Sequence, residues 1–425
     1  MYTFAIYLYA ICAKIFALFN TKARTLVRGQ KNTWKILEEK IGQDSYVWFH
    51  AASLGEFEQG RPLMERLKRE HPEKKILLTF FSPSGYEVRK DYPYADVVCY
   101  LPFDTPLNAR RFIRAARPEK AFFIKYEFWR NYIEVLVHHH IPVYSVSSIF
   151  RPNQVFFRWY GRGYGHCLRR ISHFFVQNRD SEILLNKYGI NRVTVAGDTR
   201  FARVRDIKEG AKPLPIVEAF VGRTKTEINE TKRLEESQLP DAPKNPVLIA
   251  GSSWEPDENL LIKYFNEHPN LKLVLAPHVV SEAHIQDIIS KLKRPYARYT
   301  QTDTERVKDA DCLIIDCYRL LASIYRYATV AYVGGGFGVG IHNVPEAAVY
   351  GVPVIIGPNN KKFKEAQDLL KSGGCIEIHD QEDLDEALDV YLSSPVLLKK
   401  AGDAAHDYIK ENAQAADIIY QATLE

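Results

Sequence analysis

Two glutamates in the first half of the chain directly follow apolar runs that are typical of buried strands. Glu56 closes the stretch His50–Glu56 (HAASLGE), in which Gly55 permits a tight strand-to-helix turn, and Glu127 lies within Lys125–Asn131 (KYEFWRN). A carboxylate at such a position can accept the proton of a hydroxyl, and general-base catalysis typically contributes about 10²- to 10⁴-fold. The alternatives are a helix-start residue favoured by the helix dipole for Glu56 and a surface charge among packed aromatics for Glu127.

Cationic and glycine-rich stretches follow other apolar runs and suit an anionic ligand. Arg200, in Ala196–Phe201 (AGDTRF), can reach an anionic group, and a solvated arginine is the alternative. A small-residue turn at a helix start leaves free backbone N–H groups that suit a phosphate. Such a turn is predicted after the apolar run 246–250, at Gly251, Ser252 and Ser253. Pro277 and His278 end the next apolar run.

The richest stretch spans residues 333–358 (VGGGFGVGIHNVPEAAVYGVPVIIGP). Its glycines, which begin with Gly334, Gly335 and Gly336, give a loop that can approach a phosphate or a ribose closely. Asn343 is predicted to cap a helix from about residue 344, with Glu346 at the spacing of a capping box. Neither G-x-G-x-x-G nor GxxxxGK[ST] occurs here, which argues against a dehydrogenase or a P-loop NTPase.

Metal and cofactor chemistry has little support in the sequence. The six cysteines form no CxxC pair, and no Asp-x-Asp motif ends a predicted strand. His138, His139 and His140 are consecutive, so their side chains diverge and suit a surface better than a metal site. We therefore predict neither a metal nor a cofactor.

Short apolar runs alternate with amphipathic stretches, which predicts parallel sheets covered on both faces. The strands of the first series are expected at 46–51, 75–81, 96–101, 120–125, 142–147, 172–177 and 192–196. Those of the second series are expected at 246–250, 272–276, 312–316, 329–333, 353–356 and 375–378. Ligands of such sheets bind at the carboxyl ends of the strands, so we expect two Rossmann-like α/β domains that face a cleft.

The domain organisation follows from where this alternation stops. The charged stretch 203–245 has no convincing strand and ends in the turn-rich Leu239–Pro243. We predict an apolar helix with a basic flank at 1–31, an N-terminal Rossmann-like domain at 32–210, a linker at 211–245, a C-terminal Rossmann-like domain at 246–400 and a C-terminal helix at 401–425. A chain of 425 residues is long enough for two or three domains, and its net charge of +5 does not indicate nucleic acid binding.

The first 19 residues carry one charge, Lys14, among apolar and aromatic residues. Four basic residues follow: Lys22, Arg24, Arg28 and Lys31. Basic residues beside an apolar helix favour anionic headgroups on a cytoplasmic flank, and tyrosines and phenylalanines favour the membrane interface. We expect an interfacial helix or a single anchor; a buried core helix and a cleaved signal are the alternatives.

Taken together, HAASLGE, GGGFGVGIHNVPEAA and GVPVIIGP resemble the 3-deoxy-D-manno-octulosonic acid (Kdo) transferase family, and the resemblance covers essentially the whole chain. It implies a GT-B fold and transfer of Kdo from CMP-Kdo to a lipid A precursor at the cytoplasmic face of the bacterial inner membrane. It also implies that Glu56 is the proton acceptor and that Glu127 supports the transition state. Arg200 stands where the family usually has lysine, and Pro277-His278-Val279 where it has Pro-Arg-His.

The resemblance also assigns nine residues to CMP: Pro277, His278, Tyr318, Arg319, Leu320, Asn343, Val344, Pro345 and Glu346. We expect direct displacement with inversion and without a metal. Basic residues that alternate with aromatics are candidates to receive the acceptor's phosphates, with a solvated basic helix as the alternative: Arg158, Arg162, Arg169 and Arg170. The rival interpretations are a GT-B enzyme or epimerase that uses a UDP-sugar, and a membrane-docked nucleotide-sugar binding protein.

Overall fold

The structure is a computed structural model that describes residues 2–224, 226–227, 235, 238–239 and 245–425, without the side chains of residues 160, 162 and 163. The chain forms two compact units. Unit 1 comprises Met1–Arg203 and Asn412–Glu425, and unit 2 comprises Val204–Glu411. Within the predicted linker at 211–245, residues 225, 228–234, 236–237 and 240–244 lie outside the described residues.

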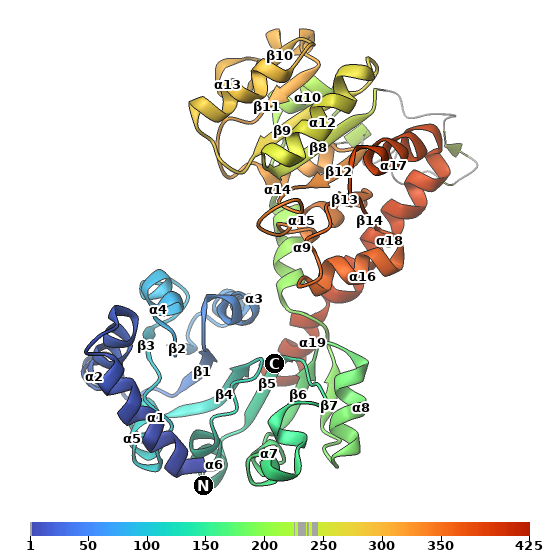
Figure 1. The fold of residues 1–425 in the computed structure, drawn as a ribbon. Coiled ribbons are helices and arrows are strands. Elements are labelled where there is room, and N and C mark those ends of the chain that lie inside the picture. The colour runs from blue at the N-terminus through green and yellow to red at the C-terminus, as the bar shows by residue number, and fades with distance from the viewer. Residues whose placement is uncertain (1, 225, 228–234, 236–237, 240–244) are drawn as a thin grey trace. The chain divides into compact units, whose positions relative to one another are not determined.

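Unit 1 is built on a parallel sheet with the strand order β3-β2-β1-β4-β5-β6-β7 (Figure 1). Its strands are β1 (Tyr46–Ala51), β2 (Lys75–Phe80), β3 (Val97–Tyr100), β4 (Pro118–Ile124), β5 (Val143–Ser148), β6 (His173–Val176) and β7 (Val193–Val195). The order reverses between β1 and β4, which pair directly. This is the topological switch point at which ligands of such sheets bind.

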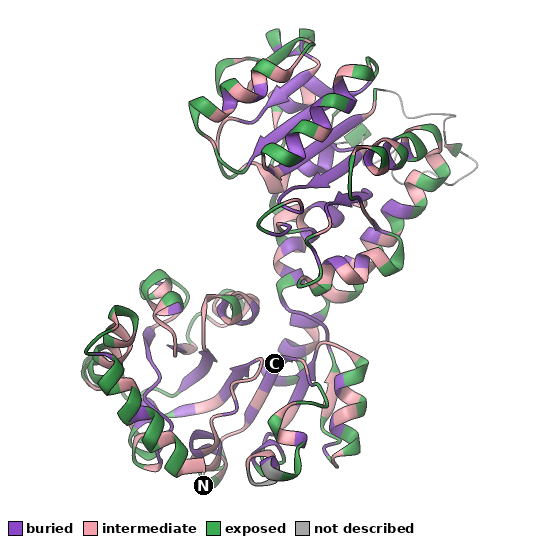
Figure 2. Ribbon diagram, viewed as in Figure 1, coloured by how far each residue is buried: buried purple, intermediate pink, exposed green. Residues whose placement is uncertain are grey.

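Helices cover both faces of this sheet because its strands are apolar on both sides. They are α1 (Tyr2–Phe16), α2 (Thr21–Lys40), α3 (Leu54–Glu70), α4 (Pro83–Arg89), α5 (Pro106–Ala116), α6 (Arg130–His138), α7 (Arg162–Leu168), α8 (Arg179–Lys187) and α19 (Ala415–Thr423), with 3₁₀ turns η1 (Val155–Phe157) and η2 (Trp159–Gly161). Trp48 faces the core under α5 and α6, and its neighbour Phe49 faces the core under α3 and α19. Figure 2 shows the buried strands between half-exposed helices.

The last helix returns to the first unit. Ala415, Ala416, Ile419 and Tyr420 of α19 join the core formed by β1, β2 and α3. The predicted C-terminal helix at 401–425 is therefore divided: α18 (Pro395–Ala413) leads out of unit 2, and α19 belongs to unit 1.

Unit 2 repeats the architecture with the strand order β10-β11-β9-β8-β12-β13-β14, and all its pairs are parallel. Its strands are β8 (Val247–Ser253), β9 (Lys272–Pro277), β10 (Tyr296–Arg298), β11 (Cys312–Ile314), β12 (Val330–Val333), β13 (Val354–Ile356) and β14 (Cys375–Glu377). Here the order reverses between β8 and β12. Strand β10 was not predicted, because it is a three-residue edge strand without buried residues.

The remaining described helices begin at the end of unit 1. They are α9 (Arg200–Gly210), α10 (Pro215–Val221), α12 (Glu255–Glu267), α13 (Glu282–Lys291), α14 (Leu321–Ile324), α15 (Pro345–Ala348), α16 (Lys364–Ser372), α17 (Gln381–Ser393) and α18, with 3₁₀ turns η4 (Tyr299–Gln301), η5 (Arg306–Asp309) and η6 (Tyr325–Tyr327). Helix α9 runs through the boundary between the units at Arg203. The predicted boundary at residue 210 instead coincides with the end of this helix.

The apolar N-terminal segment forms α1, and Asn20 caps the start of the basic helix α2 by accepting from the N–H of Ala23 at 3.0 Å. Phe4, Leu8 and Ile15 of α1 are more than half exposed, at 73%, 53% and 55%. Among the described residues no single helix is long and apolar enough to cross a membrane, and α1 and α2 meet that test only as a pair bent by 120°.

Candidate active site

The two predicted carboxylates of unit 1 follow the two strands of the switch point. β1 leads into Ser53, the N-cap residue of α3, and Glu56 lies in the first turn of that helix. β4 leads through Lys125 and Tyr126 to Glu127, just before α6. Because β1 and β4 are neighbours in the sheet, the two segments that carry the glutamates leave adjacent points of its carboxyl edge.

Glu127 is held by hydrogen bonds to two aromatic side chains. The indole Nε1 of Trp129 donates to Glu127 Oε2 at 2.8 Å and to His50 Nε2 at 3.0 Å. The imidazole of His50 is fully buried, and its Nδ1 lies 2.9 Å from Thr79 Oγ1, which also accepts from the indole of Trp48 at 2.8 Å. His50 Nε2 also lies 3.4 Å from Glu127 Oε2, so the imidazole, the indole of Trp129 and the carboxylate lie together.

Glu56 is half-buried and accepts a hydrogen bond from the hydroxyl of Ser53. Burial raises the pKa of the neighbouring Tyr126 phenol, and the negative charge of Glu56 adds to this rise. Gly55 lies inside α3 and has no positive φ, so the prediction that it forms a tight turn is wrong. The strand-to-helix turn is instead made by Ala52 and Ser53.

Arg200 begins α9 and is bound by a carboxylate that we did not single out in the sequence. Its Nε and one terminal nitrogen donate to Asp198 Oδ2 at 3.0 and 2.8 Å, and its backbone N–H donates to Oδ1 at 3.0 Å. Asp198 is 5% exposed and also accepts from Gln59 of α3 at 3.1 Å. The guanidinium is therefore oriented by a buried anion, and its charge is partly balanced before any ligand binds.

The glycine-rich stretch of unit 2 lies at the second switch point. The N–H of Gly334 donates to the carbonyl of Gly251 at 2.9 Å, which joins the ends of β12 and β8. Gly335 has φ +92°, and a Cβ there would collide with the carbonyl oxygen of Gly340. A Cβ on Gly336 would collide with the backbone of Gly357. The glycines therefore allow close backbone packing as well as close approach to a ligand.

A buried acid fixes this loop. Asp257 of α12 accepts from the N–H of Gly335 and the N–H of Trp254, both at 2.9 Å, and from the Tyr332 hydroxyl at 2.7 Å. The hydroxyl of Ser253 donates to Glu258 Oε1 at 2.9 Å, and burial raises the pKa of Glu258. The prediction that Gly251–Ser253 form a turn at a helix start is wrong, because these residues are the end of β8, where Ser252 has φ +54°.

Three rings stack at the ends of β8 and β9. The exposed ring of His278 lies between Trp254 and His342, with centroid separations of 4.6 and 4.5 Å. The indole of Trp254 donates to His342 Nε2 at 3.2 Å, and burial lowers the pKa of His342. Pro277 is buried at the end of β9. Trp254 and His342 were not among the predicted site residues, although both lie beside predicted glycine and serine turns.

Two other predicted segments lie on unit 2 loops. Tyr318 and Arg319 are exposed before α14, where the Tyr318 hydroxyl accepts from the N–H of Val280 at 3.2 Å and Arg319 has φ +76°. Leu320 is the N-cap of α14.

The predicted capping box is wrong. The N-cap of the four-residue helix α15 is Val344, not Asn343, and no side chain caps it. Asn343 instead donates through its amide nitrogen to Glu346 Oε1 at 2.7 Å, beside the buried Pro345. The helix begins close to the predicted residue 344, at Pro345, and ends after four residues.

The predicted acceptor arginines do not form one cluster. Arg158 and Arg169 donate to nearby backbone carbonyls, and Arg170 lines a groove beside α6. The side chain of Arg162 lies outside the described residues. Phe156 and Phe157, two of the aromatic residues that alternate with these arginines, pack in the core of unit 1. In the part of the chain that the structure describes, no group of three His, Cys, Asp or Glu side chains could hold a metal ion.

The sequence is similar to known transferases along most of its length. Residues 23–203 match the family described as 3-deoxy-D-manno-octulosonic-acid transferase (kdotransferase). The enzyme of that name from Aquifex aeolicus is 25% identical over 354 residues, which cover 82% of this chain and 86% of the relative. Those from Haemophilus influenzae and Rickettsia conorii are each 25% identical and cover 87% and 93% of this chain, and 84% and 83% of their own.

Solved structures share the fold at low identity. A UDP-N-acetylglucosamine 2-epimerase, described as putative, from Listeria monocytogenes has a TM-score of 0.55 and 13% identity, and covers 89% of this chain and 95% of its own. MurG from Acinetobacter baumannii has a TM-score of 0.52 and 12% identity, and covers 89% and 100%. These likenesses show a GT-B fold of two parallel-sheet domains. The family match over residues 23–203 and the relatives that align along most of the chain support the Kdo transferase family and identify a glycosyltransferase.

Proposed function

We propose that this enzyme transfers Kdo from CMP-Kdo to a hydroxyl of a lipid A precursor of the lipid IVA type, in lipopolysaccharide biosynthesis. The observation that carries the proposal is the pair of glutamates at the ends of the adjacent strands β1 and β4. The choice of Kdo as the donor sugar rests on the relatives, which are named Kdo transferases.

In the proposed reaction, Glu56 accepts the proton of the acceptor hydroxyl as that oxygen attacks the anomeric carbon of Kdo. The bond between this carbon and the phosphate oxygen breaks, and CMP leaves as a phosphate monoester. One direct displacement inverts the anomeric configuration and needs no metal. Arg200, oriented by Asp198, provides positive charge for an anionic group of the substrates, since guanidinium groups pair well with carboxylates and phosphates.

Glu127 has a supporting role in this proposal. It is engaged by Trp129 beside the buried His50, so its carboxylate keeps a fixed position. A fixed negative charge stabilises positive charge that develops on the sugar ring as the leaving group departs. Among the described residues, the Glu56 carboxylate has one hydrogen-bond partner, the Ser53 hydroxyl, and it is the better placed of the two glutamates to exchange a proton.

Unit 2 binds the donor in this proposal. The backbone of Gly251–Ser253 at the end of β8 and of the Gly334–Gly336 loop approaches the phosphate, and Asn343 and Glu346 contact the nucleoside. The exposed ring of His278 is stacked on both faces, by Trp254 and His342, and offers a polar edge for the phosphate.

We further propose that the enzyme acts at the cytoplasmic face of the inner membrane. The exposed apolar side chains of α1 support this placement, because an apolar helix face beside a basic helix is typical of interfacial binding. Helix α1 then lies in the interface while the rest of unit 1 stays in water.

Mass spectrometry of the products from CMP-Kdo and a lipid A precursor tests the function. We expect the acceptor to gain the mass of Kdo with wild-type protein and no detectable gain with Glu56→Gln. Glu70→Gln, at the other end of α3, is the matched control and should keep full activity. Absence of any product with wild-type protein, or thermal stabilisation by UDP and not by CMP, would contradict the proposal.

A further inference from the structure

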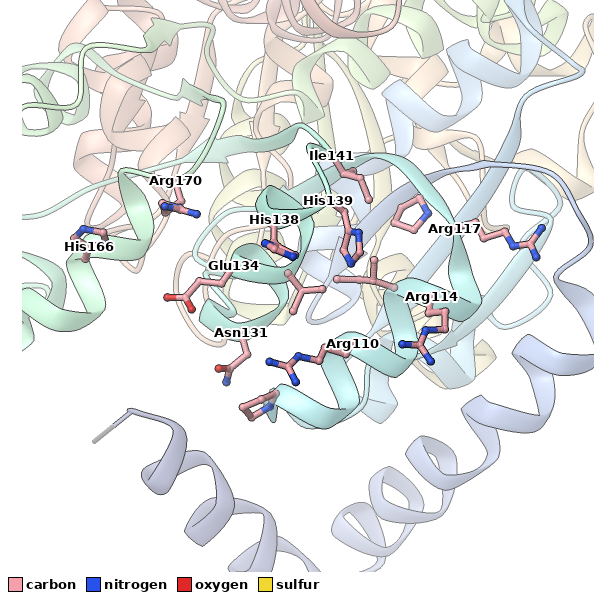
Figure 3. Close-up of a pocket in the computed structure, with 14 residues that line it drawn as sticks. Arg110, Arg114, Arg117, Asn131, Glu134, His138, His139, Ile141, His166 and Arg170 are labelled. Atoms are coloured by element: carbon pink, nitrogen blue, oxygen red, sulfur yellow. The ribbon is translucent and has the colours of Figure 1, made fainter.

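Helices α5 and α6 border a groove of about 960 Å³ on unit 1, and four arginines and three histidines make up half of the fourteen residues that line it (Figure 3). Arg110 and Arg114 are four residues apart and lie along one face of α5, about 6 Å apart at 1.5 Å per residue. Arg117 follows as the C-cap residue of this helix, with a left-handed backbone. His138 and His139 at the end of α6 complete the opposite wall.

The charge in this groove is not balanced by acids. The structure records no ion pair for Arg110, Arg114 or Arg170 among the residues that it describes. The one acid that lines the groove, Glu134, accepts from Arg130 at 2.8 Å and is thus already paired. Arginines that surround a groove without acidic partners repel one another, and a bound anion relieves that repulsion. The groove therefore suits an anion with several acceptor oxygens.

The groove extends away from the proposed reaction centre. Arg117 and Pro118 stand at the start of β4, whereas Glu127 follows its end at Ile124. Seven strand residues span about 20 Å at 3.3 Å per residue. An anion held near Arg114 and Arg117 is therefore too far from the carboxylates to be the reacting substrate.

The near end of the groove adjoins the apolar helix α1. The Thr3 hydroxyl donates to Asn131 Oδ1 of the groove at 3.4 Å, and the Tyr2 hydroxyl donates at 2.6 Å to Asp104, two residues before α5. Tyr2 also stacks on Tyr164 of α7 at 5.1 Å. A membrane that contacts the exposed apolar side chains of α1 therefore also lies next to the arginines of the groove.

We propose that this groove binds the phosphate headgroups of anionic lipids while α1 lies in the membrane interface. The inference rests on the membrane placement proposed above and adds a second, electrostatic contact to it. The apolar neighbour decides for a lipid over a soluble phosphate, because only a membrane offers both chemistries together. Two contacts of this kind fix the orientation of unit 1 on the bilayer, whereas one helix alone permits rotation about its axis.

Vesicle binding by the full chain tests the proposal. Phosphatidylcholine vesicles are compared with phosphatidylcholine–phosphatidylglycerol vesicles for wild-type protein and for Arg110→Gln/Arg114→Gln. Each basic residue near an anionic surface contributes about fivefold in affinity. The double variant should therefore lose at least about tenfold on anionic vesicles and be unchanged on neutral ones. The control Arg69→Gln/Lys90→Gln removes two exposed cations of unit 1 outside the groove and should change binding less than about twofold.

Two outcomes would overturn the proposal. One is an equal loss for the groove variant and the control, which would show a diffuse charge effect. The other is loss of Kdo transfer by the groove variant to a detergent-solubilised acceptor, which would make the groove an acceptor site. Leu8→Gln/Ile15→Gln separates the two proposals, since it should weaken binding to both vesicle types. Failure of wild-type protein to transfer Kdo would instead contradict the proposed function alone.

Discussion

The indole N–H of Trp129 donates to the carboxylate of Glu127 across 2.8 Å, although only one residue separates them in the chain. The same N–H reaches His50, whose fully buried ring is anchored to Thr79 on β2. Neighbouring strands of the sheet thus determine where the Glu127 carboxylate lies.

Trp129→Phe should lower kcat for Kdo transfer by about 10- to 100-fold while CMP binding stays unchanged. A hydrogen bond to a charged group contributes about 1.5–3 kcal/mol, and phenylalanine keeps the ring without the donor. Steady-state kinetics measure kcat, and calorimetry with CMP reports on unit 2 as the control. Equal kcat for variant and wild type would show that Glu127 does not depend on this bond.

Arg200→Lys should retain activity within about tenfold, whereas Arg200→Ala should lose more than about 100-fold. Lysine keeps the charge and can still pair with Asp198, but it cannot reproduce the two-nitrogen contact. The matched control is Arg203→Lys, in the same helix α9 as Arg200. It changes the ion pair with Glu58 of α3 and should be nearly neutral. Full activity of Arg200→Ala would remove Arg200 from the mechanism.

Gly335→Ala should weaken CMP binding and destabilise unit 2 by about 1–3 kcal/mol, because the residue has φ +92° and its new Cβ would collide with Gly340. Gly338→Ala is the matched control in the same loop, since it has no positive φ and no atom within 4 Å of its Cβ. Thermal unfolding with and without CMP measures both effects. Similar behaviour of the two variants would show that the loop tolerates a side chain at either position.

Asp104 should make the stability of unit 1 pH-dependent. Burial raises its pKa to about 6, against hydrogen bonds from Tyr2 and from the N–H groups of Asn131 and Tyr132. Because the folded pKa exceeds the unfolded one, the stabilising contribution is complete below about pH 3.8 and is lost as the pH rises to about 6. The loss is about 3 kcal/mol at 1.36 kcal/mol per pH unit.

Thermal unfolding between about pH 4 and pH 7 tests this dependence on wild-type protein and Asp104→Asn. The variant lacks the titrating group, so its melting temperature should fall less over this range than that of the wild type. Parallel curves would assign the pH dependence to other groups.

The sequence predicted most of the fold because buried parallel strands are continuous apolar runs, such as Tyr46–Ala51 and Lys272–Pro277. It missed Tyr296–Arg298, since a short edge strand needs no apolar residues. It also missed the return of residues 415–423 to unit 1, because an apolar helix face does not identify the core that it covers.

The candidate site residues at the ends of strands could be predicted from the sequence for the same reason. The buried acids that position neighbouring site residues could not. Glu56 and Glu127 are visible as carboxylates after apolar runs. Asp198 and Asp257 differ from solvated acids only in their burial and in hydrogen bonds from residues distant in the chain, Gln59 and Tyr332. Such partners depend on tertiary packing, which local patterns do not contain.

The return of α19 has a consequence for synthesis. The core of unit 1 includes Ile419 and Tyr420, so a ribosome must translate all of unit 2 before unit 1 can close around its last helix. Until then, Phe57 and Leu63 of the nascent chain lack part of their cover. Domains usually fold in the order of their synthesis. Here the domain that starts first is completed last, and the emerging polypeptide exposes an apolar surface for chaperones to protect.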